Sequence, residues 1–157
     1  MTGWGADALT GPTAGEGPEE LARRCAQVMW SSDAASRALG VELLEAGPGH
    51  AVVAMTVRKD MINGWAVCHG GLVATLADSA FAVACNSRGR VTVAAGFDVD
   101  LVEPAHLGDR LVASAREVLL RGRSGIYDVT VTRAGDDGPV TVAAFRGRSR
   151  STGRPIM

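Results

Sequence analysis

The sequence has almost no lysine and no excess of positive charge. Lys59 is the only lysine among 16 basic residues, and 17 acidic residues bring the net charge to −1 with an isoelectric point of about 6.3. A nucleic-acid-binding domain usually carries a basic field on one face. The composition therefore predicts no nucleic-acid partner.

Cysteines are few, and their spacing fits neither a disulfide framework nor a metal site. Cys25, Cys68 and Cys85 are an odd number and form no CxxC or Cys–His motif. Such residues are expected to be reduced thiols, as in a cytosolic protein. The first residues also lack the basic start and apolar run of a signal peptide. We therefore expect a cytoplasmic location and no bound metal.

Cofactor-binding and membrane-spanning segments are missing as well. The sequence contains no Rossmann glycine pattern, no P-loop and no internal repeat. The apolar stretch at residues 72–85 is too short to cross a bilayer, and an acidic residue lies near its centre. We expect no organic cofactor and no membrane partner.

The 157 residues predict one domain with a proper core. Residues 1–17 are rich in Gly, Thr, Ala and Pro without periodicity, which predicts a disordered tail. Residues 18–150 are expected to form the domain and residues 151–157 a flexible C-terminal tail. The domain begins with helices over residues 18–39, where Asp33 is the expected N-cap of the second helix.

Beyond Gly40 the apolar period changes to two, which is typical of half-buried strands. Two strands come before the apolar stretch and four follow it. Their expected ranges are 41–46, 51–58, 91–101, 111–121, 124–133 and 140–148. Strands that follow one another without interleaved helices predict an antiparallel sheet and an α+β fold.

Residues 63–86 are the stretch around which the rest of the chain is organised. They are predicted to form a loop followed by a long helix. From Leu72 to Cys85 nearly every residue is apolar on every face, so the helix is expected to be central and buried. Asp78 is the exception. It is either a structural aspartate paired with an arginine or a catalytic carboxylate, because an ionised buried acid needs a partner or a function.

The glycine pair Gly70–Gly71 opens this helix. A helix N-terminus offers unpaired N–H groups that suit a developing oxyanion, and glycine lets a ligand approach closely. The alternative is a simple turn. Gly70 and Asp78 lie eight residues apart, so about 12 Å of helix axis separates them. If they act together, two antiparallel helices across a two-fold axis must share the site, and an active monomer would exclude this arrangement.

Several motifs resemble the hotdog-fold acyl-CoA thioesterases, in particular the phenylacetic-acid-degradation (PaaI-type) branch. They are Asn63-Gly64, Cys68-His69-Gly70-Gly71, the run LADSAFA from Leu76 to Ala82, Ala84-Cys85-Asn86-Ser87, Pro104, Gly108-Asp109, Gly125-Ile126-Tyr127-Asp128 and Phe145-Arg146-Gly147. The resemblance covers roughly residues 34–150. It implies a long central helix wrapped by an antiparallel β-sheet, and hydrolysis of an acyl-CoA to a free acid and CoA.

The resemblance also implies roles for single residues. The Gly70 N–H would hold the oxyanion, and Asp78 of the partner subunit would act as nucleophile or general base. Asn63 would place water or the loop, although Asn-Gly is equally typical of a turn. His69 and Gly71 are expected to bind substrate, with His69 orienting the loop.

Apolar and basic residues complete the expected substrate site. Trp65, Met61 and Phe97 are candidates for the acyl pocket, or else core residues. Arginine forks suit the phosphates of CoA. The candidate arginines, which could also be solvated surface residues, are Arg88, Arg121, Arg123, Arg146 and Arg148.

Two other functions agree with some of these residues. His69 and Asp78 could be the His–acid pair of a hotdog hydratase or dehydratase, but its signature is absent and LADSAF follows the HGG motif. A non-catalytic acyl-CoA-binding protein would need an added DNA-binding segment, and the N-terminal helices are short and not basic. The resemblance favours a phenylacetyl or hydroxyphenylacetyl group as the acyl part. It further implies a homodimer with shared active sites, assembled into a dimer-of-dimers tetramer.

Overall fold

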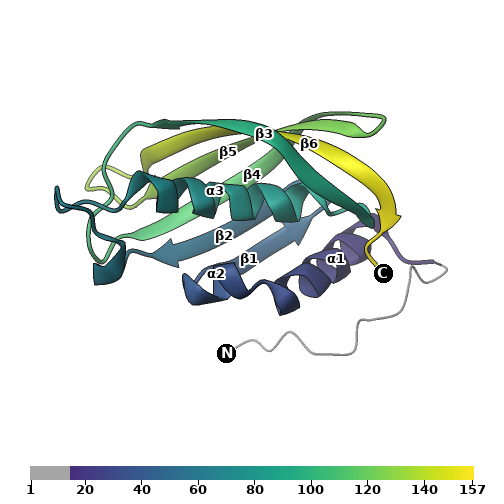
Figure 1. Cartoon of the computed structure of the whole chain (residues 1–157), viewed down its shortest axis with the longest axis horizontal. Helices are drawn as coiled ribbons and strands as arrows, with labels where there is room; N and C mark the ends of the chain where they lie inside the picture. Colours follow the sequence, from purple (N-terminus) through teal and green to yellow (C-terminus); the bar gives the residue numbers. More distant parts are fainter. Residues whose placement is uncertain (1–14) are drawn as a thin grey trace.

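Six antiparallel strands form one sheet that curves around a single long helix, α3 (Figure 1). The computed structural model describes residues 15–157 of the chain. The strand order is β1-β2-β4-β5-β6-β3. The strands are β1 (Glu42–Gly47), β2 (His50–Thr56), β3 (Arg90–Leu101), β4 (Arg110–Arg121), β5 (Ser124–Arg133) and β6 (Val140–Pro155). The predicted α+β class and all six predicted strands are confirmed.

The predicted N-terminal helices and the predicted central helix are confirmed. They are α1 (Pro18–Ser32), α2 (Ala34–Ala38), the 3-10 turn η1 (Lys59–Met61) and α3 (Gly70–Cys85). Asp33 caps α2, since its side chain accepts a hydrogen bond of 2.9 Å from the Ser36 N–H. Gly40 follows α2 with φ of 68°, a conformation that favours glycine. No helix among residues 15–157 is long and apolar enough to cross a bilayer.

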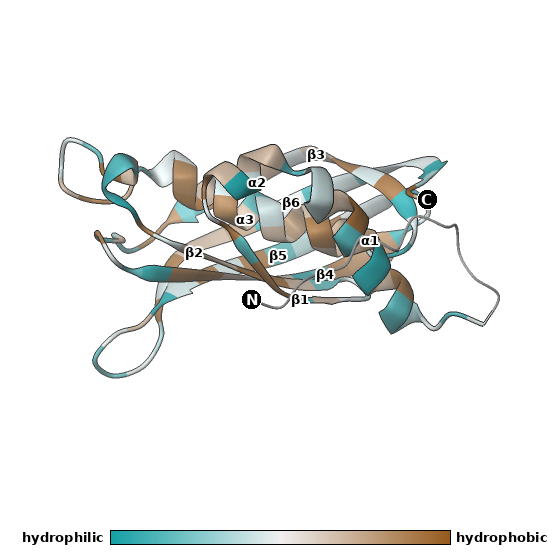
Figure 2. Ribbon diagram, turned by 90° about the horizontal axis from the view of Figure 1, so that it is seen from below, coloured by the Kyte–Doolittle hydropathy of each residue, from teal (hydrophilic) through white to brown (hydrophobic). Residues whose placement is uncertain are grey.

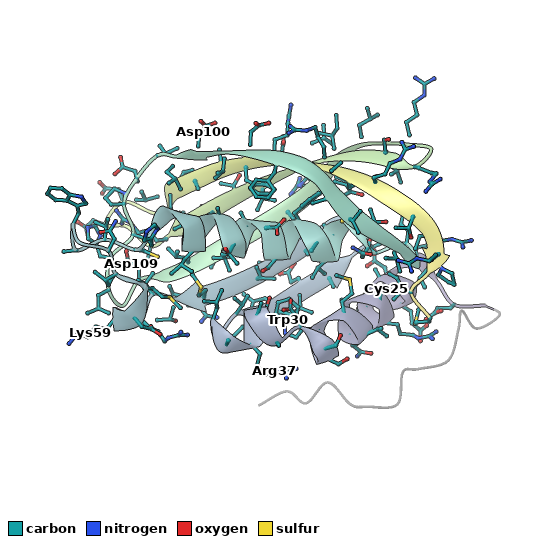
Figure 3. All side chains as sticks on the ribbon, viewed as in Figure 1. Cys25, Trp30, Arg37, Lys59, Asp100 and Asp109 are labelled. Carbon is teal, nitrogen blue, oxygen red and sulfur yellow. The ribbon has the colours of Figure 1, made fainter. Side chains whose placement is uncertain are left out.

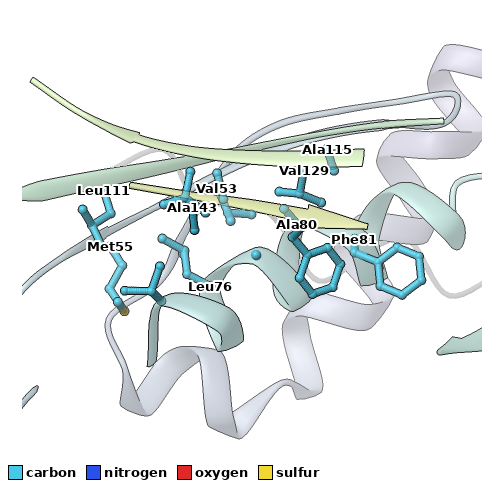
Figure 4. Close-up of a cluster of buried hydrophobic side chains, with 14 of the residues drawn as sticks. Val53, Met55, Leu76, Ala80, Phe81, Leu111, Ala115, Val129 and Ala143 are labelled. Atoms are coloured by element: carbon cyan, nitrogen blue, oxygen red, sulfur yellow. The ribbon is translucent and has the colours of Figure 1, made fainter. Parts of the chain in front are cut away.

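One face of α3 packs into the hollow of the sheet. Leu76, Ala80 and Phe81 meet Val53 and Val129 in the core (Figure 4), and hydrophobic stretches run along both α3 and the strands around it (Figure 2). The Phe81 ring occupies the space above Gly147, where a Cβ would lie 2.8 Å from three ring atoms. The glycine therefore allows the helix to lie close to β6.

The opposite face of α3 is open, which corrects the prediction of a helix buried all round. Gly71 is exposed, and Thr75, Asp78 and Ala82 are half-buried. Helices α1 and α2 lie along β1 (Figure 1), and α2 reaches the flank of α3, where the hydroxyls of Ser36 and Ser79 are 3.3 Å apart. In a single chain, the stripe that contains Asp78 thus remains uncovered.

The C-terminal segment is not a flexible tail, so the prediction for residues 151–157 is wrong. Strand β6 continues to Pro155. The Thr152 hydroxyl donates to the Val91 carbonyl at 2.9 Å, and the Ile156 N–H donates to the Gly89 carbonyl at 3.1 Å. Backbone pairing with the start of β3 orders this segment without apolar side chains. Of the expected N-terminal tail, residues 1–14 lie outside the described residues.

Candidate active site

A short loop before α3 holds the first part of the site. Asn63 closes this loop with its side-chain oxygen, which accepts from the Trp65 N–H at 2.9 Å and from the Val67 N–H at 3.3 Å. The Asn63 N–H donates to the Val67 carbonyl at 2.8 Å. Its side-chain NH2 has no acceptor among the described residues. The oxygen thus has the turn-forming role, while the amide nitrogen is available to a ligand.

Gly70 is the first residue of α3, and His69 is the N-cap. The Leu72 N–H donates a hydrogen bond to the His69 carbonyl at 2.9 Å. Within residues 15–157, neither the Gly70 N–H nor the Gly71 N–H has a recorded acceptor. The helix start therefore presents two free donors, together with the partial positive charge of the helix N-terminus.

A cavity of about 240 Å³ lies beside Gly70 and Asn63. Its walls are mainly apolar, and Glu103 is its only charged lining residue. It is lined by Asn63, Val67, Cys68, Gly70, Val73, Leu101, Val102, Glu103, Pro104, Ala105 and Val142. The Leu101 side chain fills the space next to Gly70, so that any Cβ at position 70 would collide with it. Glycine at this position lets the cavity wall approach the free N–H.

Asp78 lies in the middle of α3 without a partner. Its carboxylate forms no hydrogen bond or ion pair with any other described residue. Burial raises the pKa of Asp78 above its ordinary value. The alternative of a structural aspartate paired with an arginine is therefore not supported within one chain, and the carboxylate is half-buried, desolvated and unneutralised.

His69 belongs to a second cavity on the other side of the loop. This cavity of about 320 Å³ is lined by Asp60, Met61, Ile62, His69, Gly71 and Leu72. The His69 N–H donates to the Met61 carbonyl at 2.8 Å, which fixes the loop against η1. The predicted binding residues His69 and Gly71 therefore lie together, separate from the cavity that Gly70 and Asn63 share.

The predicted aromatic residues are not brought to either cavity in a single chain. Trp65 is 88% exposed at the loop tip, next to Ala66, whose φ of 60° is unusual for a residue with a side chain. Phe97 stacks on Phe145 with ring centroids 4.8 Å apart. Met61 is buried in the core and lines the second cavity.

Three of the predicted arginines are held by carboxylates, and one of them, Arg148, pairs with Asp98. Arg88 pairs with Glu117 at 2.9 Å just after α3. Arg146 lies on the side of the sheet that faces away from α3, where it pairs with Asp128 at 2.6 Å; Asp100 projects from the same side (Figure 3). These three guanidinium groups are thus already engaged, and Arg146 is remote from the cavity beside Gly70.

Arg121 and Arg123 lie in the hairpin between β4 and β5. Both are exposed. The Arg123 guanidinium donates to the Ser151 carbonyl at 2.8 Å, and neither residue forms an ion pair with another described residue. Unlike Arg88 and Arg146, these two arginines can therefore pair with a negatively charged ligand.

Sequence reasoning missed the strand residues that complete the cavity. Leu101 and Val142 come from β3 and β6, which meet Gly70 only after folding. Alternation marked Leu101 as an apolar residue of the expected strand 91–101. This signal could not show that the side chain of Leu101 would lie against the start of α3.

The arrangement suits attack on a carbonyl group. Free N–H donors at the helix start can hold an oxyanion, and a desolvated carboxylate can act as a base or nucleophile. Along α3 these two features are separated by about 12 Å, so they cannot act on the same atom within one chain. Among residues 15–157, no group of three or more His, Cys, Asp or Glu side chains is placed to hold a metal ion.

Comparisons with known proteins give the family. Residues 66–140 match the model of the Thioesterase superfamily. The chain is 40% identical over 131 residues to the acyl-coenzyme A thioesterase PaaI of Escherichia coli, which covers 83% of this chain and 91% of that protein. It is also 36% identical over 91 residues to human acyl-coenzyme A thioesterase 13, which covers 56% of this chain and 64% of the relative.

Solved structures agree with this assignment. The structure of the E. coli PaaI protein superposes with a TM-score of 0.84 at 38% identity, over 88% of this chain and 99% of that one. A variant of the phenylacetic acid degradation protein PaaI from Thermus thermophilus gives a TM-score of 0.69 at 41% identity, over 73% and 96% of the two chains. The chain is therefore an enzyme of the thioesterase superfamily, with the hotdog fold and a close likeness to PaaI-type thioesterases.

Proposed function

We propose that this enzyme hydrolyses the thioester of an aryl-acyl-CoA, such as phenylacetyl-CoA or hydroxyphenylacetyl-CoA, to the free acid and CoA. The likeness to the PaaI proteins supports the substrate class. The observation that carries the proposal is Asp78, a desolvated carboxylate on the open face of α3 that has no partner in the described part of the chain. A carboxylate kept in this state is suited to reaction rather than to structural support.

In this reaction, the Gly70 N–H would hold the thioester oxygen as negative charge develops on it. Asp78 of the partner subunit would attack the carbonyl carbon or remove a proton from an attacking water. The free NH2 of Asn63 lies on the wall of the same cavity and would orient that water or the carbonyl. A thiolate is a good leaving group, so the site needs no strong acid.

A second copy of the chain is the partner that this chemistry requires. Strand β3 is an edge strand, and Val93, Phe97 and Leu101 on it are 50%, 42% and 56% exposed. A long, exposed, apolar edge strand is suited to pairing with another chain. Together with the open stripe of α3, it supports a homodimer in which each site takes Gly70 from one subunit and Asp78 from the other.

The likeness to the PaaI-type thioesterases also supports a proposal for the assembly of the dimers and for the location of the protein in the cell. We propose that two such dimers associate into a tetramer. The three cysteines are free and buried, which agrees with a reducing cytoplasm. For the CoA phosphates, Arg121 and Arg123 are better candidates than Arg88, Arg146 and Arg148, because the first two have no carboxylate partner within residues 15–157.

Thiol release tests the proposal directly. Phenylacetyl-, hydroxyphenylacetyl- and straight-chain acyl-CoAs would be given to the wild type and to Asp78→Asn, which keeps the shape of the side chain and removes the charge. We expect aryl-selective release that falls about 10²–10⁴-fold in the variant. Release that survives the substitution would remove Asp78 from its role. No release from any thioester, with loss of enoyl absorbance instead, would indicate a hydratase.

A further inference from the structure

An apolar patch interrupts the side of the sheet that points away from α3, here called the outward face. Most strand residues on this face are charged or carry a hydroxyl group. Leu119 on β4 and Ile126, its neighbour on β5, are exceptions, and Val118 lies beside them at a β-bulge. Val118 and Leu119 are each 53% exposed. Antiparallel sheets usually keep polar residues on a solvated face, so this outward patch indicates contact with another molecule.

The proposed dimer cannot cover the outward patch. Strand β4 is an interior strand, separated from the edge strand β3 by β5 and β6. Pairing of two β3 strands would extend the sheet sideways and leave both outward faces exposed. Helix α3 packs on the opposite side of the sheet. A molecule that covers the patch must therefore pack onto the outward face itself.

Unpaired charges of opposite sign lie at the two ends of this region. Arg150 is exposed, and its guanidinium donates to the Ser124 hydroxyl at 2.9 Å, but it forms no ion pair within residues 15–157. Asp100 projects from the outward face (Figure 3) and likewise has no cationic partner in the described part of the chain. Each end of the region can therefore attract the other end of a second copy.

The charges between these two ends neutralise one another. Arg146 pairs with Asp128 at 2.6 Å, and Arg148 pairs with Asp98. Two copies of this middle region can therefore approach each other without net charge repulsion.

The spacing along the strands suits a two-fold contact. Asp100 lies opposite Ala144 on β6, and Ala144 is six residues from Arg150, which is about 20 Å along the strand. A two-fold axis halfway between them, running across the strands, would place Arg150 of one copy over Asp100 of the other. Ile126 lies opposite Arg148, close to this axis, so the patch would meet its own copy. An apolar centre with a polar rim is the usual anatomy of an interface.

We propose that the outward patch of Val118, Leu119 and Ile126 is the centre of a second interface, in which two dimers pack the outward faces of their sheets together. Combined with the two-fold axis of the dimer, this second two-fold axis closes a tetramer. The inference rests on the proposed function for the dimer. It gives the proposed tetramer a contact surface that is separate from the site.

The test measures the mass of the full chain in solution by light scattering and sedimentation equilibrium. Leu119→Asp puts a charge into the patch. The matched control is Leu44→Asp, because Leu44 is also an exposed leucine at a strand bulge but lies on the edge strand β1. A second set reverses charges: Arg150→Glu, Asp100→Arg and the double variant. Thiol release per chain is measured in parallel.

We expect the wild type at four times the chain mass of 16.2 kDa and Leu119→Asp at twice that mass. Thiol release per chain should be unchanged in Leu119→Asp, because each site is complete within one dimer. Leu44→Asp should keep the wild-type mass. Each single charge reversal should weaken association of the dimers at least about tenfold, since like charges then face each other across the axis. The double variant should recover the wild-type mass.

A wild type that stays at two chains at every concentration would overturn the inference. A Leu119→Asp variant that keeps four chains, an equal effect of Leu44→Asp, or a double charge variant no better than the single ones would also overturn it. The mass does not depend on hydrolysis. If the wild type releases thiol from no thioester, the proposed function fails, and the mass still decides whether the outward faces pack together.

Discussion

At the scale of single residues, the site depends on groups that the rest of the chain leaves unsatisfied. Among the described residues, Asp78 forms no ion pair, the Gly70 N–H has no acceptor and the Asn63 amide nitrogen has no partner. All three residues are half-buried in one chain, and polar groups that become buried in a folded protein are usually paired. Three unpaired groups around the start and middle of one helix are therefore better explained by a ligand than by stability.

The contribution of the Gly70 N–H can be separated from that of its missing side chain. Gly70→Pro removes the donor, and proline is favourable at the first position of a helix. His69, with φ of −60° and ψ of 125°, already has the extended conformation preferred before proline. Gly70→Ala keeps the donor but adds a Cβ against Leu101.

We expect Gly70→Pro to lower kcat by about 10²–10³-fold relative to Gly70→Ala, as for loss of an oxyanion donor. Steady-state thiol release, with thermal melting as a check on folding, would measure this difference. Equal activity of the two variants would show that the N–H does not hold the oxyanion.

Asp78 should also make stability depend on pH. Burial raises the pKa of Asp78 above its unfolded value, so the folded state binds the proton more tightly. The resulting stabilisation is complete below the ordinary aspartate pKa of about 3.9 and is lost as pH rises through the folded pKa. Urea unfolding should therefore find Asp78→Asn more stable than the wild type at pH 7, with a smaller difference near pH 4. A constant difference would contradict the shift.

At the scale of the elements, Asn86 joins the end of α3 to the start of β3. Its buried side chain donates to the carbonyls of Ala82 at 2.9 Å and Thr92 at 2.8 Å, and accepts from the Thr92 N–H at 2.8 Å. This contact fixes β3 relative to the helix that carries Asp78. It thereby sets the position of the edge strand.

Asn86→Ala should lower the free energy of unfolding by about 2–4 kcal/mol, because it removes three hydrogen bonds of a buried side chain and leaves the half-buried polar groups of Thr92 without these partners. Equilibrium unfolding in urea would measure the change. The exposed Thr141 on β6 gives a control, since Thr141→Ala should change stability by less than about 0.5 kcal/mol. Equal effects of the two substitutions would show that the Asn86 side chain is not needed to hold the end of α3 against the start of β3.

The elements also show how far the sequence could predict the structure. Period-two alternation located all six strands, and Asp33 marked the start of α2, because these signals are local. The extension of β6 to Pro155 was missed, since its backbone pairs with β3 while its polar side chains give no alternation. The wall formed by Leu101 and Val142 was missed because it depends on contacts between distant segments.

At the scale of the whole molecule, one chain is an incomplete enzyme. Its edge strand β3 is exposed, and the stripe of α3 around Asp78 is uncovered. We expect light scattering to give a mass of at least twice the 16.2 kDa of one chain. Activity per chain should fall when dilution separates the subunits. Full activity in a demonstrated monomer would exclude a shared site.

The most direct measurement mixes two inactive variants, Asp78→Asn and Gly70→Pro, after unfolding and refolding them together. If each site uses Gly70 from one subunit and Asp78 from the other, the mixed dimer contains one intact site and one doubly defective site. Random pairing should then restore about a quarter of the wild-type activity, since half of the dimers are mixed. No activity above that of the separate variants would show that both residues must belong to the same chain, which contradicts the shared active site.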